Sequence, residues 1–499
     1  MALSALVGVA LASILAADAA AVARLVLMRL EWAILVYFLV VNGWYAILLV
    51  SAAFEMREYV LLARGQARWK LAGSRVAPSI SMLAPAYNEA ATIAESVRAL
   101  LALYYPSLEV VVVNDGSKDD TLRVLVEEFE LQPIHPIYQK RIASNDVVAL
   151  YRSRSHPNLV VVDKVNGGKA DALNAGLNLA TGELVCAIDA DTLIEPDALQ
   201  RMVRPFLRKG DVVAAGGTIR IANGSRVDTG RVVMARVPRR AIPGFQVVEY
   251  LRAFLFGRLG WNRVGGNLII SGAFGLFRRD AMIAAGGYLH ETVGEDMELA
   301  LRLRRLGYEK GGPKRIDFIP DPVAWTEAPE SLRVLGRQRD RWHRGLADVL
   351  WRHRRVFLNP RYGAMGLVSF PYFVVIELLA PVVETIGLLG LLAGMLIGAI
   401  NWPFAILFFL TAYALGAVLT MMTLVLEEMS FHRYQGFVDR VLLMTWALLE
   451  NLGYRQWTVW WRLRGIWKYL RGSRSWGAME RRGFGGAKGT GTTSTAGKA

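Results

Sequence analysis

The chain has 499 residues, of which 54% are hydrophobic, and it carries a formal charge of +15. This length predicts at least two structural units, and the apolar fraction indicates membrane segments rather than a fully soluble protein. The single cysteine, Cys186, excludes an intramolecular disulfide and any multi-cysteine metal site. Because the arginines cluster near apolar segments, we expect the charge to anchor the chain at a membrane and not to bind nucleic acid.

Residues 1–55 are expected to form the N-terminal membrane segment. The apolar stretch 31–54 is long enough to cross a bilayer, and charged residues follow it. Residues 2–22 are nearly as apolar but contain Asp18, which is compatible with a first span, an interfacial helix or a signal-like leader. No cationic region precedes them, so a cleaved signal peptide is the weakest of these alternatives.

An α/β domain is predicted at residues 76–355, where apolar runs alternate with helix-like stretches such as 90–103. The runs that we interpret as strands are 80–83, 110–113, 159–162, 184–188 and 212–215. This alternation predicts a mostly parallel sheet covered by helices, with ligand sites at the carboxyl ends of the strands.

Polar motifs follow the first two predicted strands. Pro85-Ala86-Tyr87-Asn88-Glu89 comes after the first, and Asn114-Asp115-Gly116-Ser117 after the second. A carboxylate at a strand end can hold a ribose or a base edge, and an aromatic ring can stack on the base. Asn-Asp-Gly-Ser is equally typical of an ordinary turn, and taken alone it favours the turn.

The segment Asn166-Gly167-Gly168-Lys169 precedes a predicted helix at 172–179. Glycines before a helix allow backbone amides to approach an anion, and Lys169 adds a positive charge. A glycine turn with a solvated lysine explains the short pattern equally well.

The buried run 184–188 ends abruptly in Asp189-Ala190-Asp191. Two carboxylates at a strand end can hold a divalent cation, which would neutralise a departing diphosphate. An isolated Asp-x-Asp proves little, but this one has further motifs in order around it.

Gly294-Glu295-Asp296 lies just upstream of a leucine-rich helical pattern. A carboxylate at this position can be the general base that removes a proton from an attacking hydroxyl. Acidic residues are also favoured at any helix N-terminus, and this explanation prevails if the motif is viewed alone.

Gln338-Arg339-Asp340-Arg341-Trp342 precedes the C-terminal apolar block and is the most specific of the motifs. Its tryptophan can stack on a sugar ring, and its arginines can neutralise diphosphate. The alternative is a Trp and Arg belt at a membrane interface.

Residues 356–465 are expected to form interfacial and transmembrane helices, from the apolar segments 366–400, 402–426 and 438–461. Residues 466–499 are expected to be a basic cytosolic tail that is disordered after about residue 484. Because the α/β domain and the stretch 462–482 are basic, we expect both on the cytoplasmic side. Three crossings would not allow this, so either 366–400 crosses twice or one segment lies flat.

Taken in order, Asn114-Asp115-Gly116, Asp189-Ala190-Asp191, Gly294-Glu295-Asp296 and Gln338-Arg339-Asp340-Arg341-Trp342 resemble the signature of the membrane-embedded family 2 glycosyltransferases. These include cellulose, chitin, hyaluronan and poly-N-acetylglucosamine synthases. The resemblance covers residues 76–342 and implies an α/β GT-A nucleotide-diphospho-sugar transferase domain, cytosolic and inserted between N- and C-terminal transmembrane helices. It also implies an inverting transfer from a UDP-linked sugar.

The resemblance implies roles for individual residues. Asp296 is the implied base with Glu295 beside it, and Asp189 and Asp191 are the implied ligands of Mg²⁺ or Mn²⁺. The implied nucleotide and donor-binding residues are Tyr87, Glu89, Asp115, Lys169, Asp189, Gln338, Arg339 and Arg341. The implied acceptor-binding residues are Trp342, Ser271, Gly272, Ala273 and Phe274.

The chain departs from the cellulose synthase pattern. Asn114 stands where many synthases carry an aspartate, and neither a clear gating-loop sequence after Trp342 nor an appended cyclic-di-nucleotide-binding domain is found. The segments 249–254 and 269–272 look closer to the bacterial poly-N-acetylglucosamine-synthase-like branch, so we expect an integral protein of a bacterial inner membrane.

Two enzymatic functions fit these motifs. The leading one is a processive synthase that extends a polysaccharide and exports it, and the other is a non-processive enzyme that adds one sugar to a lipid acceptor. A non-catalytic nucleotide-binding scaffold is disfavoured because every expected acidic position is present. The expected partners are a UDP-sugar, a polysaccharide or lipid-linked glycan acceptor, membrane lipids and an accessory export subunit. Glu377, Glu384, Glu450 and Arg455 lie in apolar segments, where each should face a partner or a wet path.

Overall fold

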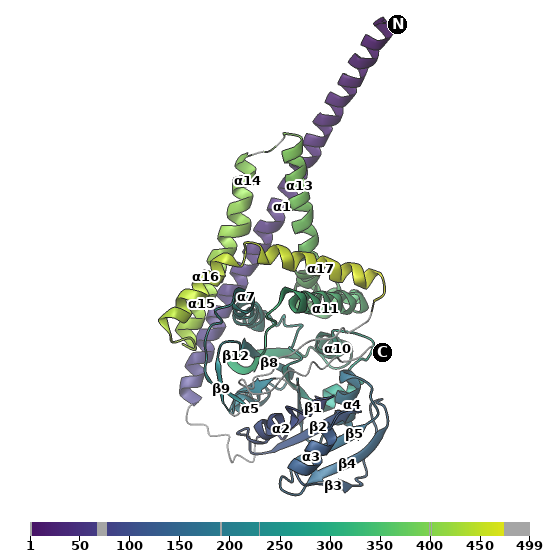
Figure 1. Ribbon diagram of the computed structural model, residues 1–499, viewed down its shortest axis with the longest axis vertical. Helices are drawn as coiled ribbons and strands as arrows, with labels where there is room; N and C mark the ends of the chain where they lie inside the picture. Colours follow the sequence, from purple (N-terminus) through teal and green to yellow (C-terminus); the bar gives the residue numbers. More distant parts are fainter. Residues whose placement is uncertain are drawn as a thin grey trace.

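The computed structural model describes residues 2–66, 77–189, 192–228, 230–398, 400 and 402–473. An α/β domain lies at one end of the molecule, and long helices from both ends of the chain extend away from it (Figure 1). The predicted metal ligand Asp191 and the tail after residue 484 lie outside the described residues.

A ten-stranded mixed sheet forms the centre of the α/β domain, in the order β3-β4-β5-β2-β1-β6-β11-β8-β12-β7. Its parallel part consists of β5 (Leu159–Lys164), β2 (Leu108–Asp115), β1 (Ile80–Ala86) and β6 (Leu184–Ile188). These strands and β8 (Val212–Ile221) contain all five predicted runs, which confirms them. Cys186 is fully buried on β6, as expected of a small core residue.

The prediction of a mostly parallel sheet is only partly correct. β11 (Phe274–Arg278) is antiparallel to both β6 and β8, whereas β12 (Arg315–Thr326) is parallel to β8. Antiparallel pairing also places β3 (Leu131–Ile134) and β4 (Val147–Ser153) at one edge and β7 (Leu193–Ile194) at the other. β11 reverses because the chain reaches it through α7 (Ala241–Leu251), η1 (Arg252–Arg258) and α8 (Leu259–Val264), and enters the sheet at the carboxyl end of β6.

Helices cover both faces of the sheet because side chains alternate along each buried strand. Val110 and Val112 of β2 join one apolar cluster, and Val111 and Val113 join the other. The first cluster includes α2 (Ile93–Leu101), α3 (Thr121–Glu128), α5 (Ala198–Met202) and the adjoining α6 (Arg204–Arg208). The second includes α4 (Lys169–Leu179), α9 (Arg279–Ala284) and α10 (Glu295–Lys310). A separate hairpin pairs β9 (Arg226–Asp228) with β10 (Arg231–Met234).

The N-terminal helix α1 runs continuously over Ala2–Gln66. Its part Ala21–Leu62 contains the predicted span 31–54 and is the helix, among the described residues, that is long and apolar enough to cross a membrane. Met365–Leu378 and Ala380–Leu396 meet at a 42° bend and form a second candidate if they count as one span. The former contains η4 (Met365–Ser369), α12 (Phe370–Tyr372) and η5 (Phe373–Leu378), and the latter contains α13 (Ala380–Leu396).

The two other C-terminal apolar segments are each divided among several helices. The segment 402–426 lies in α14 (Trp402–Phe409), η6 (Leu410–Ala414) and α15 (Leu415–Ser430). The segment 438–461 is not one helix, because Gly453 adopts φ 81° and separates α16 (Phe437–Leu449) from α17 (Tyr454–Leu470). α17 runs across the direction of α13 and α14 and packs on α11 (Leu332–Arg352) (Figure 1).

Candidate active site

A cavity of about 2830 Å³ opens at the carboxyl ends of β1, β2 and β6 and continues between α11 and the long helices. It collects most of the predicted site residues, which come from segments far apart in the sequence. These are Tyr87, Glu89, Asp115, Lys169, Asp189, Ser271, Gly272, Ala273, Glu295, Asp296, Gln338, Arg339, Arg341 and Trp342. Phe274 is not brought to this cavity, because its side chain points into the apolar core from β11.

Asp115 organises the loop that precedes α4. Its Oδ1 accepts from the backbone N–H of Gly167 at 3.0 Å, and its Oδ2 accepts from the N–H of Gly168 at 2.7 Å. The ammonium of Lys164 also donates to Oδ1, at 2.7 Å. The carboxylate is buried, so in this structure it holds the glycine loop against the end of β2.

Lys164 is a fully buried cation between two buried carboxylates. Its Nζ lies 2.7 Å from Asp115 Oδ1 and 2.5 Å from Asp171 Oδ2. The sequence analysis did not single out Lys164, although it ends the strand run that begins at Leu159. Because both carboxylates depend on this ammonium for charge compensation, Lys164 ties β2, β5 and α4 together beneath the loop.

Lys169 links the strand-end aspartate to the acidic helix start. Its Nζ lies 2.5 Å from Asp189 Oδ1 and 3.8 Å from Glu295 Oε1. Burial opposes the charge of Lys169, but Asp189 and Glu295 outweigh this effect and raise the pKa of Lys169. Burial raises the pKa of Glu295, while the charge of Lys169 lowers it in part.

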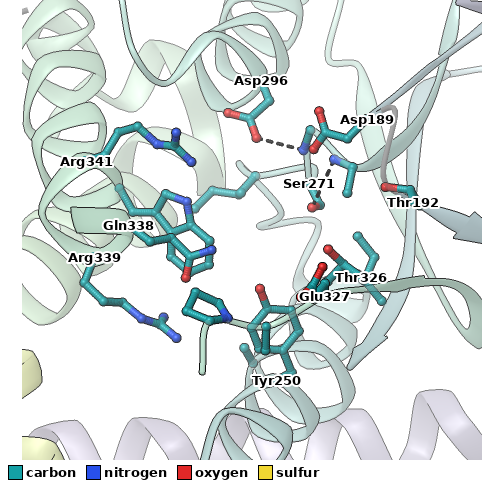
Figure 2. Close-up of a pocket in the computed structure, with 18 of the residues that line it drawn as sticks. Asp189, Thr192, Tyr250, Ser271, Asp296, Thr326, Glu327, Gln338, Arg339 and Arg341 are labelled. Atoms are coloured by element: carbon teal, nitrogen blue, oxygen red, sulfur yellow. Dashed lines mark hydrogen bonds between the residues drawn. The ribbon is translucent and has the colours of Figure 1, made fainter. Parts of the chain in front are cut away.

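Asp296 is held in place by backbone amides on both of its oxygens. Its Oδ2 accepts from the N–H of Gly272 at 2.8 Å, and its Oδ1 accepts from the N–H of Met297 at 2.8 Å. Figure 2 shows Asp296 and Asp189 on opposite sides of the segment that carries Ser271. This carboxylate therefore faces the cavity in a fixed orientation, as a general base requires.

We expect Gly272→Ala to impair transfer without unfolding the protein. A Cβ at this position would lie 3.2 Å from Asp296 Oδ2 and 3.3 Å from Lys169 Nζ, so the carboxylate would have to shift. A misplaced base should reduce kcat by roughly tenfold to a hundredfold. Gly210→Ala is the matched control, because a Cβ there meets nothing within 4 Å. Equal kcat in the two variants would contradict the positioning role.

The side chains of the motif at 338–342, on α11, point in different directions. Arg341 points toward Asp296, whereas Arg339 points toward Tyr250 (Figure 2). Arg339 Nη2 donates to Glu249 Oε2 at 2.7 Å, and its guanidinium carbon lies 4.6 Å from the centre of the Trp342 ring. Of the two arginines, Arg341 is thus the one directed at Asp296, while Arg339 supports Trp342.

Asp340 faces away from the cavity and fastens α17 to α11. Its Oδ2 accepts from Arg464 Nε at 2.9 Å and from Lys468 Nζ at 2.5 Å. Close approach of the two helices also requires Gly465, where a Cβ would lie 2.7 Å from the carbonyl oxygen of Asp340. The middle residue of the motif therefore serves helix packing.

Several cavity residues were missed by the sequence analysis. Thr326 and Glu327 lie together at the end of β12, and Thr192 and Tyr250 also face the cavity (Figure 2). Thr326 and Glu327 could have been found from the sequence, because they directly follow the apolar run Val323, Ala324 and Trp325. The other motifs follow their strands in the same way.

Asp189 is the predicted metal ligand that lies among the described residues. Asp189 lies at the cavity with its side chain 30% exposed, and no group of three or more His, Cys, Asp or Glu ligands occurs within the described ranges. A protein site with few carboxylate ligands fits a Mg²⁺ or Mn²⁺ ion that takes its other ligands from a diphosphate and water.

Comparison with known proteins gives two overlapping family matches. The model described as "Glycosyl transferase family 2" matches residues 81–284, and the model described as "Glycosyl transferase family group 2" matches residues 184–426. Together they include every motif from Tyr87 onward, so the chain is shown to share the family's sequence pattern across the cavity.

Two curated relatives are similar over different lengths. Poly-beta-1,6-N-acetyl-D-glucosamine synthase of Staphylococcus epidermidis is 29% identical over 273 residues, or 55% of this chain. The match covers 56% of that relative, so the chain spans about half the length of the synthase. Probable glycosyltransferase YdaM of Bacillus subtilis is 25% identical over 84% of this chain and 89% of its own length.

A solved structure shares the fold. Mannosyltransferase PcManGT from Pyrobaculum calidifontis, in complex with GDP-Man and Mn²⁺, superposes with a TM-score of 0.50. It is 21% identical, and the match covers 85% of this chain and 98% of the mannosyltransferase. The predicted GT-A α/β fold is confirmed, with a mixed sheet.

Proposed function

Because the chain belongs to glycosyl transferase family 2, we propose that it transfers sugar with inversion from a UDP-sugar to a growing polysaccharide and exports the product. The observation that carries this proposal is the continuous cavity, which joins Asp189 and Asp296 to charged residues on the long helices. The catalytic domain would lie on the cytoplasmic side, with Ala21–Leu62 as a membrane anchor.

The chemistry follows from the placement of a few side chains. Asp296 takes the proton of the acceptor hydroxyl as that oxygen attacks the anomeric carbon, and the bond to the diphosphate breaks on the opposite side. Arg341 and Lys169 compensate negative charge that develops on the leaving group. Trp342, held by Arg339, offers a flat face to the acceptor sugar.

Asp189 and Asp191 would hold Mg²⁺ or Mn²⁺ at the end of β6. The ion, when bound, would supply positive charge that stabilises the departing diphosphate and so lowers the activation free energy of transfer. Tyr87, Glu89 and the loop organised by Asp115 would surround the nucleoside, because they line the cavity next to this strand end.

The proposed activity is tested by incubating the purified protein in detergent with Mn²⁺ and a radiolabelled panel of UDP-N-acetylglucosamine, UDP-glucose and UDP-galactose. The name of the staphylococcal relative makes UDP-N-acetylglucosamine the first donor to test. We expect a polymer whose length grows with time, identified by digestion with linkage-specific glycosidases. A product with a single added sugar would favour the non-processive alternative.

The membrane end of the cavity supports export. Glu377, Glu384, Glu450 and Arg455 all line it, although each has a protein partner. Arg455 pairs with Glu384 at 2.9 Å, Arg252 pairs with Glu450, and the Tyr372 hydroxyl donates to Glu377 at 2.9 Å. Charged side chains that are paired and also line a cavity suit a path for a hydroxyl-rich chain.

We expect Glu384→Gln to lower export more than polymerisation. The amide cannot balance the charge of Arg455, so the wall of the proposed path changes while Asp296 is untouched. Inverted membrane vesicles separate the two activities, since exported polymer is protected inside them from an added glycosidase. Glu127→Gln, which alters an exposed carboxylate on α3, is the control. Equal loss of protected and total polymer would remove the export claim for this residue.

A further inference from the structure

Arg258 is a cavity-lining cation that the proposed chemistry does not use. It ends the π-helical segment η1, between α7 and α8, and lines the same cavity as Asp296 and Glu377. Widened helical turns of this kind occur frequently at functional sites, where they redirect a side chain. Arg258 therefore belongs to the wall that connects the proposed base to the membrane part of the cavity.

The guanidinium of Arg258 is fixed on one side and incompletely satisfied on another. Its Cζ lies 4.2 Å from the centre of the Phe254 ring, so the plane is supported by a cation–π contact. Its Nη1 is buried and has no hydrogen-bond partner. Leaving a buried donor unpaired is costly, and arginine presents five donors in a fixed fork.

Arg252, at the other end of η1, is by contrast an arginine with structural partners within the protein. Its Nη1 donates to Thr420 Oγ1 at 3.1 Å and pairs with Glu450, so it ties η1 to α15 and the C-terminal end of α16. Arg258 has no such ion pair among the described residues. Unlike Arg252, Arg258 therefore has a hydrogen-bond donor at the cavity wall that remains available for a ligand.

Arg258 carries its charge at neutral pH. Burial lowers its pKa to about 10, and the charges of Asp296, Tyr250 and Glu377 act in the opposite direction. The protonated guanidinium of Arg258 therefore interacts electrostatically with the proposed base, Asp296, and with Glu377 on η5. Such a group suits the oxygen atoms of a saccharide, which accept hydrogen bonds and bring no charge to bury.

We propose that Arg258 is an acceptor-binding residue whose guanidinium donates hydrogen bonds to oxygen atoms of the sugar next to the reacting one. This rests on the proposed polysaccharide synthesis and assigns one contact within it. By fixing the penultimate sugar, Arg258 would hold the terminal hydroxyl against Asp296 and allow the chain to move on toward Glu377. Hydroxyl oxygens and the carbonyl oxygen of an acetamido group would serve equally as acceptors.

The test compares Arg258→Gln and Arg258→Lys with Arg263→Gln in the full-length protein. Arg263 is the matched control, because it follows on α8 with its side chain 53% exposed. Binding of a β-1,6-linked N-acetylglucosamine hexamer and of UDP with Mn²⁺ is measured separately by calorimetry, and thermal unfolding checks folding. We expect Arg258→Gln to weaken hexamer binding about tenfold and to leave UDP binding unchanged. Arg258→Lys should recover only part of the loss, since an ammonium lacks the planar fork.

Two outcomes would overturn the assignment. Hexamer binding equal to wild type in a folded Arg258→Gln variant would show that the guanidinium does not contact the acceptor. Weakened UDP binding would place Arg258 on the donor instead. Failure of the proposed polysaccharide synthesis would give a different result from failure of the Arg258 assignment. In that case the wild-type protein would bind the hexamer but add no sugar to it.

Discussion

Replacing Asp296 with asparagine should reduce the rate of sugar transfer by at least about a hundredfold while leaving the nucleotide site intact. Asparagine has the same shape and can still accept from the Gly272 amide, which now lies 2.8 Å from Oδ2, but it cannot take a proton. Loss of a general base costs roughly a hundredfold to ten-thousandfold in rate. The measurement is initial polymer synthesis with a radiolabelled UDP-sugar, together with calorimetric binding of UDP.

Glu295→Gln is the informative companion, because Glu295 is the adjacent carboxylate and is buried. Its Oε1 lies 3.8 Å from Lys169 Nζ, which suits an electrostatic role, so we expect a smaller loss than for Asp296→Asn. If Asp296→Asn retained transfer and Glu295→Gln did not, the assignment of the base would have to be exchanged.

The largest effect on stability is expected from Lys164→Met. Methionine fills a similar volume but leaves Asp115 and Asp171 buried without the ammonium that lies 2.7 and 2.5 Å from them. Breaking such a buried arrangement by removing one partner costs about 3–5 kcal/mol. We expect a clearly lower midpoint of thermal unfolding and, where the protein remains folded, weaker UDP binding through the loop at Gly167 and Gly168.

Lys140→Met provides the control for Lys164→Met, because its ammonium is exposed and lies 3.7 Å from the exposed Asp146. An exposed pair contributes little, so this variant should unfold close to wild type. An unchanged unfolding midpoint for Lys164→Met would show that the carboxylates find compensation elsewhere, and the proposed role of the triad would be wrong.

Much of the α/β domain could be predicted because its signals are local. A strand such as Leu184–Ile188 must be apolar along its whole length to be buried on both faces, and its end is marked by the first charge, Asp189. The same logic found the strand ends near Tyr87 and Asp115. Their meeting in one cavity follows from parallel neighbours whose carboxyl ends lie at one edge.

What escaped prediction depends on contacts between distant segments. Arg339 points away from Arg341 because it pairs with Glu249, ninety residues away in sequence, and Asp340 faces away from the cavity because it pairs with Arg464 and Lys468. The reversal of β11 depends on how η1 and α8 pack along α1, which no periodic pattern in the sequence predicts. Phe274 looked like part of an acceptor-side loop, but it is the first residue of β11 and its side chain enters the core.

The central claim is that Asp189, Asp296 and Trp342 surround one activated sugar, and a structure determined with Mn²⁺ and a non-hydrolysable UDP-sugar tests it most directly. We predict that the diphosphate lies between Asp189 and Arg341, with the anomeric carbon turned toward Asp296 and Trp342 on the acceptor side. A donor bound outside the cavity, or one whose anomeric carbon is turned away from Asp296, would contradict the account.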